Sequence, residues 1–490
     1  MPGMNRRRFL EGVLATGMTG AGASIRAAED DSSSANEKLS VAVIGVNGRG
    51  QAHVGEFKAR SDCSVRVVCD ADSQVGQRVA QAVGPDCKFV QDMRHVFDDP
   101  AIDIVSIATC SHWHALAAIW AMQAGKDVYV EKPASWCIAE GRRMVQAARK
   151  YGRICQVGTQ YRSDLAKAAA ARYMAEGQLG KITLARSVTY KRRQSIGSRV
   201  QGQVPASVDY NLWAGPAPMS PITRQNFHYD WHWFWEFGNG DLGNSDVHRI
   251  DLVRFGVGVD RLPRAVMSYG GRVGYEDAAE TPNTQIVIHD YGDLTVVQEV
   301  RGLDCKSGFG PPAGMFVGSE GYLVFGGSGA TVFDTKGKKR HEFTGATADA
   351  SGQASPDLGD LSRSHFANFV RAVRSRRVED LNSDIAGGHI SAGLCHLGNI
   401  SYRLGRPASP REILQQLELR KIHADVADTF ERTRHHLAAN GVDIDKTPLI
   451  LGPWLELDPV RERFVGNATA DGLLSREYRR PFVVPEEREV

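Results

Sequence analysis

The chain has 490 residues, of which 42% are hydrophobic and 24% are charged, and its formal net charge is +2. A chain of this length is too long to fold around one ordinary hydrophobic core, so we expect two domains with extensions. The net charge is close to zero and gives no basis for a nucleic-acid or membrane partner. The eight cysteines form no Cys-x-x-Cys pair and no metal-ligand spacing, so we expect neither a disulfide framework nor a metal site.

The first residues have the pattern of an export signal. Arg6 and Arg7 lie in a stretch that looks like a twin-arginine signal, and a mildly apolar segment follows over residues 12–25. That segment is too short and too rich in glycine and threonine to span a membrane stably. We expect residues 1–37 to be an export signal and linker, and the mature protein to be periplasmic; the alternative is a basic disordered tail. Because the twin-arginine route moves folded proteins, a cofactor loaded in the cytoplasm could cross with the protein.

A glycine-rich turn follows the first apolar strand, Leu39–Ile44, and predicts a dinucleotide site. In order, its residues are Gly45, Val46, Asn47, Gly48, Arg49 and Gly50. The turn matches G-x-G-x-x-G at its first and third glycines, but Asn47 stands at the second position with Gly48 beside it. We expect a helix over residues 52–59, whose N-terminus would face a phosphate.

A second strand, residues 64–69, ends at Asp70. An acidic residue about 20 positions after the glycine turn is placed to accept both ribose hydroxyls. It would also repel a 2′-phosphate, so NAD is favoured over NADP. The alternative for Asp70 is a helix cap or turn residue, although Asp72 and Ser73 are also placed to cap the next helix.

The alternation of strands and helices continues to residue 158 and predicts an open parallel sheet. Further strands are expected at residues 88–90, 102–107, 127–130 and 154–157, and helices at 93–97, 115–124 and 138–150. His112 and His114 follow the strand at 102–107. They are candidates for the ligand crevice at the carboxyl ends of the strands, or else loop residues that pack on the next helix.

The strand at residues 127–130 ends in Glu131-Lys132-Pro133. A lysine at this position lies where doubly wound sheets bind ligands. A desolvated lysine close to a cofactor can carry a proton while a hydride moves. The alternative is a surface lysine in a loop that Pro133 holds in place.

The second half of the chain changes character. After a helix at residues 164–176, short strands dominate and several alternate polar with apolar residues, which predicts an antiparallel sheet with one covered face. These strands are expected at residues 182–190, 265–269, 284–289, 294–300, 315–317, 322–325 and 331–333.

An aromatic-rich stretch, residues 227–235, interrupts these strands. It contains six aromatic residues together with His228, Asp230 and His232, as expected of a platform for a sugar ring. The alternative is a hydrophobic cluster that pins a long loop.

Directly after this stretch, Asn244 and His248 are four residues apart and share one face if the segment is helical. Asp246 and Asp251 are placed to orient the histidine.

These residues resemble the Gfo/Idh/MocA family, the glucose–fructose oxidoreductase and inositol dehydrogenase group, over residues 38–405. Glu131-Lys132-Pro133 matches the family's Glu-Lys-Pro motif, whose lysine is the usual catalytic residue. Residues 240–251 look like the family's Asp-x-x-x-His helix, with the histidine at His248. The aspartate position holds Asn244, and an amide cannot accept a proton, which puts in doubt a relay through this position. Residues 157–163, 210–215 and 389–404 also look like exported members.

The resemblance implies a Rossmann-type parallel sheet followed by a domain built on a large, mostly antiparallel sheet. The expected division is 1–37 signal and linker, 38–158 nucleotide domain, 159–360 substrate and oligomerisation domain, 361–406 helices packing back on the core, and 407–490 extension. We expect that extension to wrap the surface or a neighbouring subunit.

The resemblance also implies the roles of single residues. The catalytic candidates are Lys132 and His248. The candidates for cofactor binding are Gly45, Asn47, Gly48, Arg49, Gly50, Asp70, His114, Glu131 and Gln160. The candidates for substrate binding are Arg162, His228, Trp233, Asn244 and His248. We expect a tightly bound NAD, a sugar, glycoside or cyclitol substrate, and a homo-oligomer.

Two alternatives stay open beside an NAD-dependent oxidoreductase. Some relatives oxidise a sugar hydroxyl only transiently, so that a glycosidic bond is eliminated and the hydride returns. That redox-neutral chemistry suits an exported protein with a trapped cofactor, and Asn244 fits it. The second alternative is a non-catalytic NAD-binding or sugar-binding protein, against which Lys132 and His248 argue.

Overall fold

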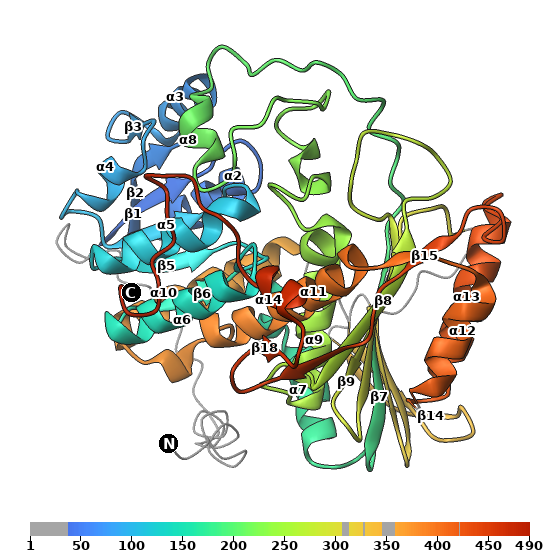
Figure 1. The fold of residues 1–490 in the computed structure, drawn as a ribbon. Coiled ribbons are helices and arrows are strands. Elements are labelled where there is room, and N and C mark those ends of the chain that lie inside the picture. The colour runs from blue at the N-terminus through green and yellow to red at the C-terminus, as the bar shows by residue number, and fades with distance from the viewer. Residues whose placement is uncertain (1–37, 306–312, 327–328, 345–357, 421) are drawn as a thin grey trace, which may run out of the picture.

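The computed structural model describes residues 38–305, 313–326, 329–344, 358–420 and 422–490 (Figure 1). The expected export signal lies outside the described residues. Within them, no helix has the length and apolar content needed to cross a membrane.

The first domain is the parallel sheet that the sequence predicts. Its six strands are arranged in the order β3-β2-β1-β4-β5-β6, and every neighbouring pair is parallel. The strands are β1 (Leu39–Ile44), β2 (Cys63–Cys69), β3 (Lys88–Val90), β4 (Ile104–Ile107), β5 (Asp127–Val130) and β6 (Cys155–Val157). The strand order reverses between β1 and β4, and such a switch point opens a crevice at the carboxyl ends of the strands.

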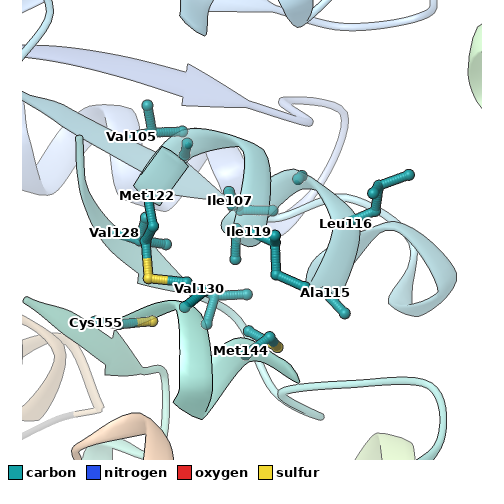
Figure 2. Packing of buried hydrophobic residues seen from close by; sticks show 14 of the residues in the cluster. Val105, Ile107, Ala115, Leu116, Ile119, Met122, Val128, Val130, Met144 and Cys155 are labelled. Atoms are coloured by element: carbon teal, nitrogen blue, oxygen red, sulfur yellow. The ribbon is translucent and has the colours of Figure 1, made fainter. Parts of the chain in front are cut away.

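Helices cover both faces of this sheet. They are α2 (Arg49–Lys58), α3 (Ser73–Val83), α4 (Arg94–Phe97), α5 (Ser111–Gln123) and α6 (Ile138–Lys150). Figure 2 shows one of the resulting cores, where side chains of β4 and β5 pack against α5 and α6. On the other face, Phe366 of α10 (Leu358–Ser375) stacks on Tyr129 of β5, with ring centroids 4.2 Å apart.

The second domain is a mostly antiparallel sheet of twelve strands. Eight of them are β7 (Ile182–Tyr190), β8 (Ala265–Gly271), β9 (Thr284–Asp290), β10 (Thr295–Arg301), β11 (Gly314–Gly318), β12 (Gly321–Phe325), β13 (Gly329–Phe333) and β14 (Lys339–Thr344). Each expected strand occurs, and β14 was not expected because its residues are polar and exposed. The pair β7–β10 is the parallel exception among these eight.

The expectation of one covered face is wrong for the middle of this sheet, because β8, β9 and β10 are buried along their whole length. One face packs on α7 (Leu165–Ala175), α9 (Val247–Val257) and α11 (Ile385–Arg403). The other face packs on two helices of the extension, α12 (Pro410–Leu419) and α13 (Asp425–Ala439). Alternate residues of a strand point to opposite faces, so both halves of each strand contribute to a core.

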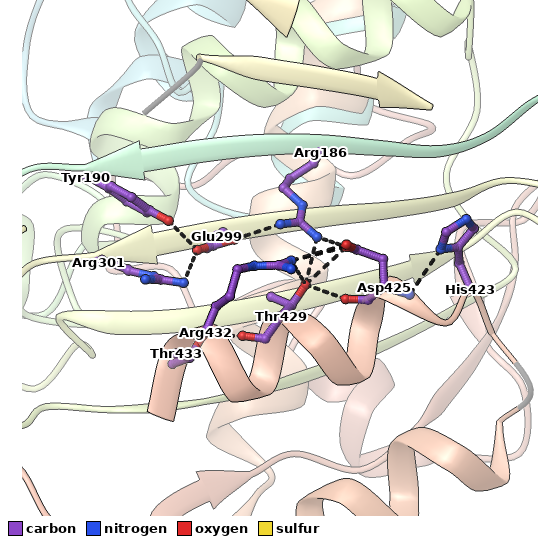
Figure 3. A network of polar contacts seen from close by, with 9 residues as sticks. All are labelled: Arg186, Tyr190, Glu299, Arg301, His423, Asp425, Thr429, Arg432 and Thr433. Carbon is purple, nitrogen blue, oxygen red and sulfur yellow. Dashed lines mark hydrogen bonds and ion pairs between the residues drawn. The ribbon is translucent and has the colours of Figure 1, made fainter. Parts of the chain in front are cut away.

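A buried polar network fixes α13 on the sheet (Figure 3). The Arg186 guanidinium lies 3.5 Å from the carboxylate of Glu299, donates to the Thr429 hydroxyl at 2.8 Å, and pairs with Asp425. The Tyr190 hydroxyl donates to Glu299 at 2.7 Å. Buried charges need such partners, so the network gives α13 one specific position on an otherwise apolar face.

The rest of the extension adds β15 (Arg406–Ala408), β16 (Leu449–Leu451), β17 (Leu455–Asp458), β18 (Arg463–Phe464) and α14 (Ala468–Gly472). Residues 474–490, which we call the strap, then return to the first domain (Figure 1). Phe482, Val484 and Val490 are buried in the core of that domain, and the Phe482 ring packs edge-on against Trp113 of α5 at 5.4 Å. The extension therefore wraps both domains of its own chain.

Candidate active site

A cleft with a volume of about 730 Å³ opens at the carboxyl ends of β1, β2, β4 and β5. The first domain contributes the glycine turn, Asp70 and Lys132 to its lining. The second domain contributes Asn244 and His248 together with part of the insertion, which we define as residues 191–241 between β7 and α9. Residues far apart in the sequence thus meet at one site.

The glycine turn has the geometry of a phosphate cradle. Gly45 has φ +81°, and a Cβ there would lie 2.7 Å from the backbone nitrogen of Thr109; a Cβ on Gly50 would lie 1.9 Å from the carbonyl oxygen of Gly45. Helix α2 begins at Arg49, three residues before the expected start, and no side chain caps it. Gly48 and Arg49, at the N-terminus of α2, line the cleft, and a helix N-terminus at this position fits the pyrophosphate of a dinucleotide.

Asp70 lines the cleft at the end of β2. Its carboxylate accepts hydrogen bonds from the backbone N–H of Val46 at 2.7 Å and of Asp72 at 2.9 Å. Burial raises its pKa, although these two hydrogen bonds oppose the shift. Asp72 caps α3 by accepting from the N–H groups of Gln74 and Val75, so the capping role belongs to Asp72.

Glu131 is buried and holds the turn, α2 and the strand ends together. Its carboxylate accepts from Arg49 Nε at 2.8 Å, lies 3.1 Å from His53 Nε2, and lies 3.5 Å from Gln160 Nε2. Burial alone would raise its pKa, but the hydrogen bond with His53 and the charge of Arg49 outweigh burial and hold the pKa well below the usual range. Sequence reasoning missed His53, although its position four residues after Arg49 places both on one side of α2.

Lys132 extends into the cleft from the end of β5. Its Nζ donates to the backbone oxygen of Asn244 at 2.6 Å and lies 3.4 Å from Asn244 Oδ1. Burial lowers the pKa of Lys132, with the charge of Glu131 acting against that shift. A lysine of this kind is prepared to lose its proton more readily than a solvated one.

Asn244 and His248 both line the cleft, but they do not belong to one α-helix. Leu242–Asp246 form a π-helical turn that runs into α9 at Val247. π-Helical turns are rare in proteins as a whole, but those that occur are often found at functional sites. Burial lowers the pKa of His248 to about 3, so its imidazole is neutral at pH 7.

The expected orientation of His248 by two aspartates is wrong. Asp246 accepts from Ser187, Thr189 and Gln298, which lie on the sheet. Asp251 accepts from both Nε and Nη2 of Arg162, at 2.7 and 2.9 Å. Arg162 is thus engaged with a buried carboxylate and is not among the lining residues of the cleft.

The insertion forms the wall of the cleft opposite the strand ends. Trp213, His228, Tyr229, Trp231 and His232 line it. His228 Nε2 lies 3.3 Å from a carboxylate oxygen of Asp72. Trp233 belongs to a hydrophobic cluster of the insertion instead, and the Arg193 guanidinium lies 4.7 Å from its ring centroid. The aromatic stretch thus contributes both to the lining of the cleft and to the hydrophobic cluster, and Trp231 belongs to both.

His232 is a lining residue that sequence reasoning did not single out. Its Nδ1 lies 2.6 Å from the carbonyl oxygen of Tyr229, so Nδ1 carries the proton and Nε2 is left as an acceptor. Burial lowers its pKa to about 3, and the charge of Lys132 also acts on it. The signal was present, since two histidines stand within the aromatic run.

The two histidines after β4 lie on the first turn of α5, which begins at Ser111 rather than near residue 115. His114 lines the cleft, with its ring nitrogens 2.7 Å from the Pro133 oxygen and 3.1 Å from the Thr109 oxygen. His112 Nε2 donates to the carbonyl oxygen of Trp213 at 3.0 Å. His112 therefore supports the insertion and His114 the Lys132 loop. The described residues contain no group of three or more His, Cys, Asp or Glu side chains that could hold a metal ion.

Two family models match the chain. Residues 39–159 match the Gfo/Idh/MocA oxidoreductase family, NAD-binding Rossmann fold, and residues 178–299 match the C-terminal alpha/beta domain of the same family. A levoglucosan dehydrogenase from Pseudarthrobacter phenanthrenivorans is 29% identical over 47% of this chain and 54% of its own length. The scyllo-inositol 2-dehydrogenase (NAD(+)) of Bacillus subtilis is 34% identical over 29% of this chain and 41% of its own length.

These matches span about half the length of the curated relatives. A solved structure of levoglucosan dehydrogenase, in complex with NADH and levoglucosan, aligns with a TM-score of 0.57 at 21% identity. That alignment covers 74% of this chain and 96% of the solved chain, so both domains have the same fold. The chain belongs to the Gfo/Idh/MocA family of NAD-binding oxidoreductases, because both of its domains match models of that family.

Proposed function

We propose that the protein is an NAD-dependent oxidoreductase that acts on a hydroxyl of a sugar, glycoside or cyclitol, with Lys132 as the acid–base residue. The observation that carries this proposal is the position of Lys132. It is a buried lysine with a lowered pKa, and it lines the same cleft as the glycine turn and Asp70. Levoglucosan and scyllo-inositol dehydrogenases are relatives, which supports a polyhydroxylated ring as the substrate.

Different residues of the cleft have different roles in the proposed oxidation of an alcohol. Bound NAD⁺ supplies the acceptor for the hydride that leaves the carbon. Neutral Lys132 accepts the hydroxyl proton, and the backbone oxygen of Asn244 holds its Nζ in place through the 2.6 Å hydrogen bond. His248 is neutral and hydrogen-bonds the same hydroxyl, while His232 Nε2 accepts from a neighbouring hydroxyl.

We also propose that the dinucleotide is held tightly. The insertion is bonded to the loop that follows Asp70, through Asp209 N–H to the Ala71 oxygen and Ser73 N–H to the Ser207 oxygen, both at 2.9 Å. These bonds tie the insertion to the first domain beside Asp70, and we propose that the insertion thereby slows release of a bound dinucleotide. A tightly held cofactor also suits the proposed export of the folded protein to the periplasm.

The test is the nucleotide content of protein purified without added nucleotide. Denaturing the protein should release about one equivalent of NAD(H) and little NADP(H). Protein that is empty but binds added NAD would leave the oxidoreductase proposal standing and contradict tight retention. Protein that binds neither nucleotide would contradict the proposed function.

A second candidate function is redox-neutral cleavage of a glycoside, in which the hydride returns to the sugar. Asn244 at the family's aspartate position favours it, as do the bonds between the insertion and the loop after Asp70. Product formation from a glycoside without net change in NADH absorbance would support this candidate. Stoichiometric NADH formation would support the dehydrogenase.

Asp70 offers a prediction about cofactor choice. We expect Asp70→Ser to weaken NAD binding by about 10-fold to 100-fold, since it removes a charged hydrogen-bond acceptor at the proposed ribose site. Binding of NADP should weaken less, because the repulsion of a 2′-phosphate is also removed. Titration of tryptophan fluorescence with both nucleotides checks this, with exposed Asp86→Ser as the control. An unchanged ratio of the two dissociation constants would place the ribose elsewhere.

The strap offers a prediction about cofactor retention. Arg479 Nη1 and Nη2 donate to the side-chain and backbone oxygens of Asn211, at 2.7 and 2.8 Å, and Nε donates to the Ala217 oxygen at 3.3 Å. These bonds hold α8 (Tyr210–Ala214), which carries the cleft residues Leu212 and Trp213. We expect Arg479→Ala to accelerate NAD dissociation about 10-fold, because charge-assisted hydrogen bonds to this wall are lost.

The measurement is the NAD(H) that remains bound after dilution and gel filtration, followed over time. Arg480→Ala is the matched control, since Arg480 is the adjacent exposed arginine. The rate constant of chemistry in single turnover should be the same in both variants. Equal retention in the two variants would show that the strap does not position this wall.

A further inference from the structure

A second pocket lies beside the cleft, with a volume of about 680 Å³. Its lining comes entirely from the insertion, in two segments at residues 192–197 and 225–233. Asn226 and Tyr229 line this outer pocket and also the main cleft. The two hollows are therefore neighbours with a common wall, and one molecule could extend from the first into the second.

Tyr229 differs from the other aromatic residues of the insertion. Trp231, Trp233 and Phe234 are 7%, 4% and 5% exposed and belong to the hydrophobic cluster, whereas Tyr229 is 44% exposed and lies outside it. Its ring stands at the common wall, and its hydroxyl lies 3.5 Å from Arg193 Nη1. The ring contacts His232, with ring centroids 4.8 Å apart, but Tyr229 stays 44% exposed, which leaves aromatic surface between the two hollows.

The rest of the lining is polar and suits hydroxyl groups. Arg192, Gln194, Ser195 and Gln225 supply donors and acceptors, and Arg192, Gln194 and Ser195 are exposed. An aromatic ring beside amide, hydroxyl and guanidinium groups matches a pyranose, which presents an apolar C–H face and a rim of hydroxyls. A flat apolar ligand would leave most of these polar groups without partners.

The outer pocket is held in place by hydrogen bonds from Arg193 to the segment that leads into α9. Arg193 donates through Nε to Asp241 at 2.8 Å and through Nη2 to Ser245 at 3.0 Å. Ser245 follows Asn244, which accepts from Lys132, so the outer pocket is tied to the π-helical turn at the reactive end. Gly197 has φ +80°, a backbone conformation that favours glycine at this point of the pocket wall. A preformed site lowers the entropic cost of binding.

We infer that the outer pocket is a second saccharide subsite. The unit that is oxidised lies in the main cleft at Lys132, and a second pyranose unit in glycosidic linkage to it lies in the outer pocket, against Tyr229. The substrate class is then a glycoside of two or more units rather than a free monosaccharide. This inference rests on the proposed function, because it assigns the reacting unit to the main cleft.

The experiment compares monosaccharides with matched disaccharides. The probes are glucose and galactose against cellobiose, maltose and lactose, titrated into the NAD-loaded protein and followed by tryptophan fluorescence. We expect at least one disaccharide to bind about 10-fold more tightly than its monosaccharides, which is a modest gain for one stacked ring and its hydrogen bonds.

Two variants test whether the tighter binding of the disaccharide comes from the outer pocket. Ser195→Trp fills the outer pocket from a position that does not line the main cleft, and Gln225→Ala removes one amide from the outer pocket. Both should reduce the ratio of disaccharide to monosaccharide affinity toward one, and both should leave monosaccharide affinity unchanged. Ser198→Trp, at an exposed serine outside the pocket lining, is the control for Ser195→Trp.

The outcomes separate this inference from the proposed function. Disaccharides that bind no more tightly than monosaccharides, or a ratio that Ser195→Trp leaves unchanged, would overturn the second subsite. NADH formation from a monosaccharide would keep the oxidoreductase proposal standing in that case. Absence of binding by every probe would overturn the subsite, and the nucleotide-release assay would then decide the proposed function separately.

Discussion

Replacing Lys132 with methionine is expected to lower the turnover number by about 10²-fold to 10⁴-fold, the usual contribution of general acid–base catalysis. Methionine keeps an unbranched chain of similar length but has no group that can accept a proton. The amount of bound NAD(H) should not change, because the glycine turn and Asp70 do not depend on the amine. Single-turnover oxidation of a sugar by the NAD-loaded protein measures the effect.

The pH dependence gives an independent readout of the same residue. Oxidation requires neutral Lys132, so the rate should rise with pH through the pKa of this lysine and level off above it. Burial lowers that pKa, so the rise should come below the ordinary lysine value of 10.5. In Lys132→Met this limb should be absent. Lys181→Met is the control, since Lys181 lies on the surface in an ion pair with Asp293. A variant that keeps the wild-type rate and profile would remove Lys132 from the mechanism.

Replacing Arg162 with alanine is expected to lower the free energy of unfolding by about 3–5 kcal/mol, the usual cost of leaving one member of a buried ion pair without its partner. Asp251 is fully buried, with 0% of its surface exposed, and Arg162 supplies two hydrogen bonds to it. The nearest Arg254 nitrogen, at 3.7 Å from Asp251, offers only a longer-range replacement. Urea denaturation followed by circular dichroism measures the change.

The exposed pair Arg172–Glu176 supplies the comparison, because both side chains are about half exposed. Arg172→Ala should cost less than about 1 kcal/mol. The Arg162 experiment also decides between two roles for this residue. A stable Arg162→Ala protein with weakened sugar binding would return Arg162 to the substrate site that the sequence predicted for it. An unstable protein with normal sugar affinity would confirm the structural role.

Local patterns predicted much of the fold and the centre of the site. The apolar strands and the polar residues at their ends are short-range signals, so the sequence alone suffices to place the parallel sheet, Asp70 and Lys132. The starts of α2 and α5 were placed too late, because neither helix has a side-chain cap and both begin with residues that do not signal a helix. Boundaries without capping chemistry carry little sequence signal.

The missed features depend on tertiary contacts. No spacing in the sequence shows that Arg162 pairs with Asp251, or that Tyr229 rather than Trp233 faces the cleft. The 3₁₀ turn at Asp230–Trp233 decides which aromatic side chains turn inward, and its direction depends on the cluster around it. The second covered face of the sheet was missed for the same reason, since α12 and α13 lie more than a hundred residues after the strands they cover.

The strap affects when the first domain can finish folding relative to translation. Trp113 lies in the nucleotide domain, and Phe482, its packing partner, is synthesised some 370 residues later. Until then α5 exposes apolar surface, so a nascent first domain needs protection from aggregation. Folding is thus completed after translation has passed the strap, which gives the cell an interval for inserting a nucleotide before Arg479 secures α8 beside the cleft.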